Sequence, residues 1–337
     1  MHRPWGHIDW CLNLSAPKQW DFIGCIGPEE RSIAAFLRLS TASLVSTSTL
    51  LEIEDPESPY RDQARELLAE RKRAIANCSP AATVLPLSLL SSVITVEEST
   101  KALTGKSIIL DISSLPKRFF FFLLKKFFRS SNVENLVLIY TLAEGYPSAP
   151  IAENHDMWDA LPTFRNPDPD LEEKAHRRLL VNVGFIPDGL IAHLENRADE
   201  NQIDLIVPFP ASVAAMNRTW QTVWALRSTP YRARFNEYRV GALDLSEAFD
   251  LILSLMPVDS NLVSFAPFGP KPISAAMCLY ATLTGSPVYY AQPKIYRPDY
   301  SIGVCTKAGQ QQITGYWIKH EGANLFTLPP HRSSLTS

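Results

Sequence analysis

The sequence predicts an α/β protein made of two tandem Rossmann-like halves with mainly parallel sheets. Two observations support this prediction. Apolar runs of strand length alternate with helical patterns along the whole chain, as in parallel sheets that helices cover on both faces. Similar short segments also recur about 150 residues apart, and 337 residues are enough for two domains of roughly 150 residues each.

The first half is expected to cover residues 1–146. Its strand signals are apolar runs bounded by Gly, Pro or charged residues, and they cover 21–27, 43–54, 82–90, 107–112 and 135–140. A helix opens at Pro28, which suits the first helical turn, and runs to Leu39. Three more helices are expected, over 60–77, over 97–103 and over the Phe-rich stretch that begins at Phe119.

The second half is expected to cover residues 175–330, after a Pro-rich linker over 147–174. The same alternation resumes there. Strands are expected over 179–184, 203–207, 237–243, 262–266 and 288–291, with helical segments over 190–195, 211–226, 246–256 and 273–284. The Ser-rich residues 331–337 are expected to form a flexible tail.

Three similarities in the same order along both halves favour an internal duplication. Gly27 and Gly184 each follow the first strand of a half, and Lys117 and Lys271 each end a Pro-Lys loop after a later strand. Tyr140 and Tyr146 match Tyr290 and Tyr296 in spacing. The two halves are therefore interpreted as copies of one unit.

Composition limits the function classes. With 32 basic and 35 acidic residues the net charge is -3, which argues against a protein that coats duplex nucleic acid. The five cysteines form no CxxC pair and are interpreted as reduced, and no secretory signal is recognised at the N-terminus. No apolar run reaches the length of a membrane span. We therefore expect a cytoplasmic protein without membrane contact.

The two Pro-Lys loops are the first candidate site, because ligands of open parallel sheets bind outside the carboxyl ends of the strands. Ser113, Ser114, Lys117 and Arg118 offer hydroxyls and cations to an anion such as a phosphate. In the second half, Gly269 and Lys271 offer a smaller set. The alternative is that Ser and Pro only start the following helix while the cations are solvated.

Further candidates follow other strands. Asp111 ends a strand, where a carboxylate orients a ribose hydroxyl, binds a metal or caps a helix. Gly27, Arg31 and Ser32 follow the first strand, although no GxGxxG motif supports dinucleotide binding. Tyr296 belongs to an aromatic group that could stack a base or serve packing alone. The histidines have no zinc-ligand spacing, and neither a metal nor another cofactor is predicted.

The pattern Asp111-x-Ser113-x-x-x-Lys117 resembles the ligand-binding motif of CARF domains, the CRISPR-associated Rossmann-fold sensors of cyclic oligonucleotides. The segment 268–271 resembles a Gly-and-Lys version of the same loop. The resemblance implies that the halves mimic a CARF homodimer, with Ser113, Lys117, Gly269 and Lys271 lining a shared cleft. It also implies a separate effector protein in a prokaryotic antiviral defence system. Phe265 departs from the pattern, and no effector segment is recognised in the sequence.

Three functions remain open from the sequence. The first is a nucleotide-sensing regulatory subunit that binds an anionic nucleotide ligand at the strand ends. The second is an enzyme acting on nucleotides or nucleosides, in which Asp111, Glu29 and Arg31 would converge. The third is a non-catalytic assembly subunit of a larger complex, since fold alone does not define function. A homo-oligomer is compatible with each of the three.

Overall fold

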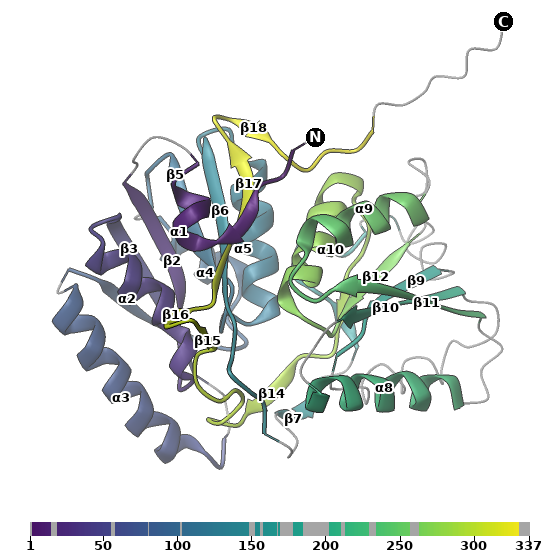
Figure 1. Cartoon of the computed structure of the whole chain (residues 1–337), viewed down its shortest axis with the longest axis horizontal. Coiled ribbons are helices and arrows are strands. Elements are labelled where there is room, and N and C mark those ends of the chain that lie inside the picture. Colours follow the sequence, from purple (N-terminus) through teal and green to yellow (C-terminus); the bar gives the residue numbers. More distant parts are fainter. Residues whose placement is uncertain are drawn as a thin grey trace, which may run out of the picture. The chain divides into compact units, whose positions relative to one another are not determined.

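The chain folds into two compact units, which the computed structural model in Figure 1 shows. Unit 1 comprises residues 1–157 and 291–325, and unit 2 comprises 158–290 and 326–337. The structure describes residues 2–14, 19–54, 58–79, 81–101, 103–147, 152–155, 158–166, 168, 178–184, 202–209, 213–228, 234–256 and 263–329. The predicted tail, 13 of the 28 residues of the predicted linker and the expected helical segment 190–195 lie outside these residues.

Unit 1 contains a sheet in which five consecutive strands are parallel. Their order is β6-β5-β2-β3-β4, with bounds Trp20–Ile26 for β2, Val45–Glu54 for β3, Thr83–Ser88 for β4, Ser107–Asp111 for β5 and Asn135–Thr141 for β6. Numbered along the chain, this is the order 5-4-1-2-3, which is that of a Rossmann fold. Two strands extend the sheet in antiparallel pairing beyond β6, namely β17 (Ile313–His320) and then β1 (Trp5–His7), and β18 (Ala323–Asn324) pairs with β17.

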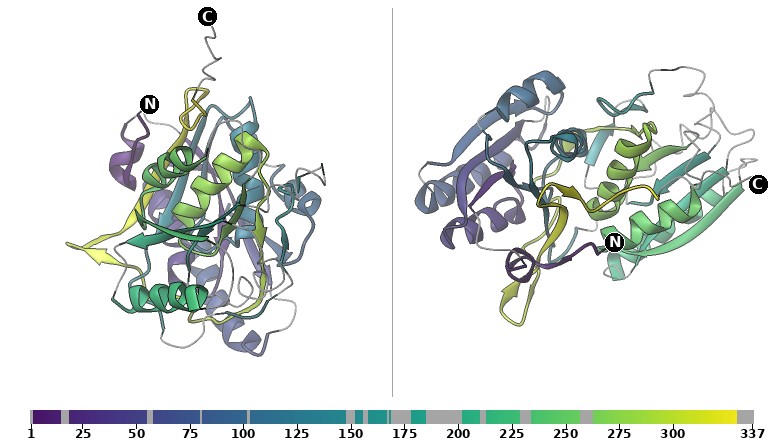
Figure 2. Two further views of the ribbon diagram at one scale, coloured as in Figure 1. Left: turned by 90° about the vertical axis from the view of Figure 1, so that its right-hand side faces the viewer. Right: turned by 90° about the horizontal axis from the view of Figure 1, so that it is seen from above.

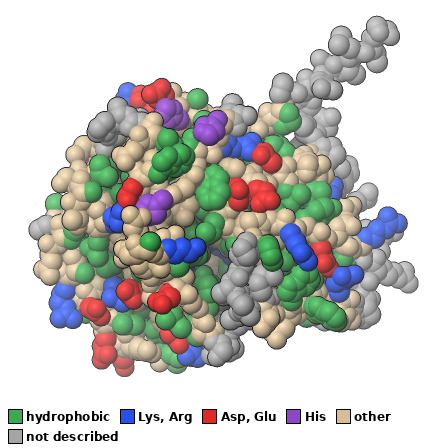
Figure 3. Space-filling view, in the orientation of Figure 1, with side chains coloured by type: hydrophobic (Ala, Val, Ile, Leu, Met, Phe, Trp, Pro, Cys, Tyr) green, Lys and Arg blue, Asp and Glu red, His purple; other side chains and the backbone are tan. Residues whose placement is uncertain are grey.

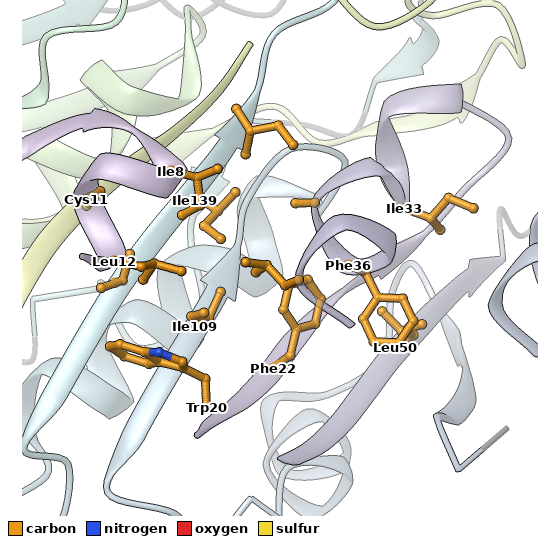
Figure 4. Close-up of a cluster of buried hydrophobic side chains, with 14 of the residues drawn as sticks. Ile8, Cys11, Leu12, Trp20, Phe22, Ile33, Phe36, Leu50, Ile109 and Ile139 are labelled. Carbon is orange, nitrogen blue, oxygen red and sulfur yellow. The ribbon is translucent and has the colours of Figure 1, made fainter. Parts of the chain in front are cut away.

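Helices cover both faces of this sheet. One face packs a cluster of buried side chains from β2, α1 (Ile8–Leu12), α2 (Ala34–Thr41) and α3 (Arg61–Cys78), with Trp20, Phe22 and Phe36 among its members (Figure 4). The Phe-rich α5 (Lys117–Arg129) covers the opposite face and contacts α4 (Val93–Ser99) (Figures 1 and 2). All six of its Phe side chains except Phe122 are buried. Burying a Phe stabilises a fold by about 1.5–3 kcal/mol, so this stretch holds the sheet layer together.

Unit 2 repeats the strand order of unit 1. Its parallel sheet has the order β11-β10-β9-β12, with bounds Arg178–Asn182 for β9, Gln202–Phe209 for β10, Arg234–Gly241 for β11 and Ser264–Pro267 for β12. A parallel bridge between Phe265 and Val288 adds a fifth position beside β12. Its helices are α8 (Val213–Ser228), α9 (Leu245–Leu255) and α10 (Lys271–Thr284). The predicted α/β class with mainly parallel sheets is therefore confirmed, whereas the internal duplication stays a prediction.

The division into units differs from the one that the sequence predicts. Residues 291–325 lie within the expected second half, yet their strand β17 pairs with β6 of unit 1. Tyr296 therefore belongs to unit 1 while Tyr290 belongs to unit 2, so the expected match of these two residues with Tyr140 and Tyr146 does not hold. Apolar periodicity marks a strand but carries no information about its partner, which explains the difference.

Short antiparallel pairs join the remaining segments. The strand β7 (Ala152–His155) pairs with β14 (Pro293–Tyr296), and β8 (Asp159–Ala160) pairs with β13 (Tyr289–Tyr290). A hairpin joins β15 (Thr306–Lys307) to β16 (Gln310–Gln311), and a 3-10 turn covers Glu30–Ser32. Residues 158–290 of unit 2 are thus inserted between the two segments of unit 1, and paired short strands lie at both ends of the insertion.

The helices and the surface charges bear on two sequence-based expectations, the absence of membrane contact and the nearly balanced charge. Within the described residues, no helix is both long and apolar enough to cross a lipid bilayer. On the face shown in Figure 3, Lys and Arg side chains are interspersed with Asp and Glu side chains. This mixture agrees with the overall net charge of -3.

Candidate functional site

The site of interest in unit 1 is where the strand order reverses, between β2 and β5. The loop after β2 leads to one side of the sheet and the loop after β5 to the other, which leaves a crevice position in folds of this kind. Gly27 follows β2, and the segment 111–117 follows β5. The nearest atom to a Cβ added to Gly27 would be the Cβ of Ser32, at 4.0 Å. The backbone at this position therefore has room beside it.

A chain of hydrogen bonds fixes the loop after β5. Asp111 Oδ1 accepts from the backbone N–H of Ser113 at 2.8 Å and from its hydroxyl at 2.5 Å. The same Ser113 oxygen accepts from the backbone N–H of Thr141, at the end of β6, at 2.8 Å. Asp111 and Ser113 are buried, so the carboxylate shapes the loop.

A buried ion pair continues this network on the β2 side. Arg31 is only 2% exposed and donates from Nε to Glu29 Oε2 at 2.9 Å. A second nitrogen of its guanidinium donates to the Tyr140 hydroxyl at 3.3 Å and to the Thr141 carbonyl at 3.4 Å. The hydroxyl of Ser301 donates to the same Glu29 oxygen. Asp111, Ser113, Thr141, Arg31 and Glu29 are thus linked end to end.

Tyrosines surround the Arg31 guanidinium. The guanidinium carbon lies 5.7 Å from the centroid of the Tyr140 ring. Burial would lower the pKa of Arg31, but the Glu29 carboxylate and the neighbouring tyrosines raise it well above its usual value, so Arg31 stays charged. Burial raises the pKa of Tyr146 and of Tyr300, and the Tyr300 ring contacts the Tyr296 ring at 5.9 Å. These hydroxyls therefore stay protonated at neutral pH.

The start of α5 supplies the cationic part of the site. Lys117 is the first residue of α5 and is 8% exposed, after the N-cap residue Pro116. The first turn of α5 contains no acidic residue, so its positive dipole end is not neutralised by its own helix. Ser114 is half-buried just before it. Arg118 points elsewhere, because it donates to the carbonyl oxygens of Leu90 and Ser91.

In unit 2 the equivalent position is filled. A Cβ on Gly184 would lie 2.2 Å from the Phe268 carbonyl oxygen, and one on Gly269 would lie 2.1 Å from Asn182 Oδ1. The Asn182 amide donates to the Pro270 carbonyl at 2.9 Å and to the Ser274 hydroxyl at 3.0 Å, which ties β9 to the start of α10. Gly269 is therefore a close-packing residue, and half-buried Lys271 begins α10 as Lys117 begins α5.

The two Pro-Lys loops are alike in backbone geometry. The N-cap residue Pro116 has φ -55° and ψ 144°, and Pro270 has φ -54° and ψ 142°. Both follow the fourth strand of a 3-2-1-4-5 sheet, which is β5 in unit 1 and β12 in unit 2. The N-cap prolines of the two loops therefore have the same backbone conformation.

The structure brings together most of the predicted site residues of unit 1. Gly27, Arg31, Ser32, Asp111 and Ser113 lie in or next to the network, with the Ser32 hydroxyl donating to the Gly27 carbonyl at 3.1 Å. Tyr296 is connected to the network through its ring contact with Tyr300, and Arg118 is not a member of the network. Sequence reasoning missed Thr141 and Ser301 as members. Thr141 follows directly after the flagged Tyr140, but nothing local marks Ser301.

The acidic side chains that the structure describes around this network are not arranged as metal ligands. Within the part of the chain that the structure describes, no group of three or more His, Cys, Asp or Glu side chains is placed to hold a metal ion. The carboxylates of the network already accept hydrogen bonds, Asp111 from Ser113 and Glu29 from Arg31 and Ser301.

Comparison with known proteins identifies no family. No protein-family model matches the chain, and no curated protein matches it. The cytoplasmic domain of a prokaryotic cation chloride cotransporter is 12% identical over 82% of this chain and 96% of that one, with a TM-score of 0.25. A functionally unknown protein from Pseudomonas aeruginosa PAO1 is 14% identical over 81% and 92%, with a TM-score of 0.23. At such TM-scores neither similarity bears on function.

Proposed function

We propose that the chain is a nucleotide-sensing regulatory subunit of the CARF-like type, which binds an anionic nucleotide ligand at the strand ends of unit 1. The observation that carries the proposal is the room beside Gly27, at the switch point where the strand order of unit 1 reverses between β2 and β5. Gly184, at the corresponding place in unit 2, has no such room. A buried glycine whose added Cβ would meet nothing closer than van der Waals contact allows a ligand atom to approach the backbone closely. Lys117 and the acid-free start of α5 supply positive potential for a phosphate.

The network favours binding over catalysis. Asp111 and Glu29, the carboxylates of the enzyme hypothesis, are both held as hydrogen-bond acceptors within the protein. A general base needs a carboxylate that reaches the proton it abstracts, and these two are engaged with Ser113 and Arg31. A regulatory site needs only a preformed shape and charge. An effector protein that reads the bound state, in a prokaryotic antiviral system, belongs to the same proposal.

Calorimetric titration of the full chain with AMP, ATP and a cyclic oligonucleotide of four adenylates tests the proposal. We expect saturable binding of at least one probe, weakened about tenfold or more by Lys117→Ala and by Gly27→Ala, as the loss of one charge-assisted contact or of backbone access predicts. The exposed Lys101→Ala is the matched control and should bind as the wild type. Absence of binding, or equal loss in the control, would refute the site.

The same samples separate the sensor from the enzyme. The probe that binds is incubated with the protein and followed by chromatography and mass spectrometry. A regulatory subunit returns the nucleotide unchanged, and the unchanged nucleotide supports the proposal. Turnover that disappears in Asp111→Asn would establish the enzyme hypothesis instead.

A further inference from the structure

A second surface of interest lies in unit 2, at the carboxyl end of β10. Phe209, the last residue of β10, is 45% exposed, and Trp224 on α8 is 70% exposed. Both are large apolar side chains, and a protein surface that gathers such groups commonly marks a binding site. The surface is independent of the site in unit 1.

An arginine lies within cation–π distance of two aromatic rings at this place. The guanidinium carbon of Arg239 lies 5.9 Å from the centroid of the Phe209 ring and 5.9 Å from that of Trp220. The register of β10 and β11 explains this, because Arg239 lies opposite Val207 and side chains two positions apart share a face. Trp220 packs on the core cluster of unit 2 and is thereby fixed. Trp224 follows one turn later on α8, on the same side of the helix.

The charge of Arg239 is not balanced locally. Glu237 shares the face of Arg239 on β11, but it pairs with Arg227 at 2.8 Å. Among the residues that the structure describes, Arg239 has no carboxylate partner, and its interactions are the two ring contacts. Its guanidinium is therefore oriented in advance, with its N–H donors available to an anion. Planar, bidentate donation of this kind suits phosphate.

We propose that this surface, composed of Phe209, Trp220, Trp224 and Arg239, binds single-stranded nucleic acid. Exposed aromatic rings stack unpaired bases without regard to sequence, and Arg239 receives the adjacent phosphate. Duplex nucleic acid hides its bases and offers no face to Trp224. A protein partner would use the rings equally well but would not need an unpaired guanidinium to meet a phosphate at the same place.

Fluorescence anisotropy with labelled 12-nucleotide oligothymidylate tests this surface in the full chain at low salt. We expect Trp224→Ala to weaken binding at least about fivefold, since stacking contributes roughly 1–3 kcal/mol per base. Arg239→Gln should weaken it and reduce the salt slope by about one unit, as the loss of one phosphate contact predicts. Trp224→Phe should restore most of the binding. Trp10→Ala replaces another half-exposed tryptophan, in unit 1, and is the control.

Two competitors decide between ligand sources. Free thymidine monophosphate should compete only at far higher concentration than the oligonucleotide, and a duplex of equal length should bind more weakly. The proposal is overturned if the wild type does not bind, if Trp224→Ala and Arg239→Gln bind normally, or if duplex or mononucleotide binds as well as the oligonucleotide. Because both changed side chains are exposed, circular dichroism is expected to show an unaltered fold.

Discussion

Arg31 and Glu29 form an ion pair at 2.9 Å in which the side chains are only 3% and 11% exposed. The pair lies two residues apart on the loop after β2, and it joins that loop to β6 through Tyr140 and Thr141. A buried pair of this kind adds little net stability compared with apolar residues, but losing one member leaves a charge without compensation.

Glu29→Gln is therefore expected to destabilise unit 1 by about 3 kcal/mol or more, because Arg31 would remain charged and buried. Urea unfolding followed by circular dichroism measures this loss. Glu98→Gln is the matched control, since Glu98 pairs with Lys101 on the surface at 3.8 Å and should change stability by less than about 0.5 kcal/mol. Equal effects of the two changes would show that the pair is not structurally important.

Ser113→Ala and Thr141→Val are expected to differ in their effect on stability. Ser113→Ala removes the oxygen that serves both Asp111 and the Thr141 amide, and should cost about 1–3 kcal/mol. The Thr141 hydroxyl is buried with no hydrogen-bond partner among the described residues, so Thr141→Val should be neutral or stabilising. Thermal unfolding compares them, with the exposed Ser254→Ala as control. A destabilising Thr141→Val would mean that the hydroxyl has a partner.

The two strand-end glycines should respond differently to alanine. Gly184→Ala places a Cβ 2.2 Å from a backbone oxygen and is expected to cost at least about 1–3 kcal/mol, as overpacking does. Gly27→Ala meets nothing closer than 4.0 Å and should leave stability within about 1 kcal/mol. Denaturant midpoints of both variants test the contrast. Unfolding of the protein by Gly27→Ala would contradict the finding that a Cβ fits beside Gly27.

Alkaline pH should weaken the fold through the buried tyrosines. The pKa values of Tyr146 and Tyr300 are raised by burial, so the folded protein keeps their protons at a pH where the unfolded chain loses them. Their contribution is fully present below about pH 10, the ordinary tyrosine pKa, and is lost as the pH rises through the folded values. Urea midpoints between pH 8 and 11 should fall, and fall less steeply in Tyr300→Phe. A flat profile would contradict this assignment.

Sequence patterns were sufficient for local structure and insufficient for long-range contacts. The strand over 107–112 and the helix after it were predictable because apolar runs, Pro and charged residues mark them directly. The pairing of β17 with β6 was not, since periodicity gives no partner. Ser301 reaches Glu29 across 272 positions, which no local signal indicates. Lys117 and Arg118 look equivalent in sequence, but consecutive residues of a helix point about 100° apart, and Arg118 donates to the carbonyl oxygens of Leu90 and Ser91 instead of joining the network.

The route of the chain sets an order for folding during synthesis. The strand β17, which lies between β1 and β6, is made only after all of residues 158–290 have been made. Until then β6 presents an unpaired edge, and such edges attract other strands. Unit 2 has the earlier opportunity to fold, although Phe326, which contacts its Phe249 ring at 5.1 Å, arrives last. The nascent protein therefore passes through a stage in which the inserted unit is nearly complete while its host still has an open sheet.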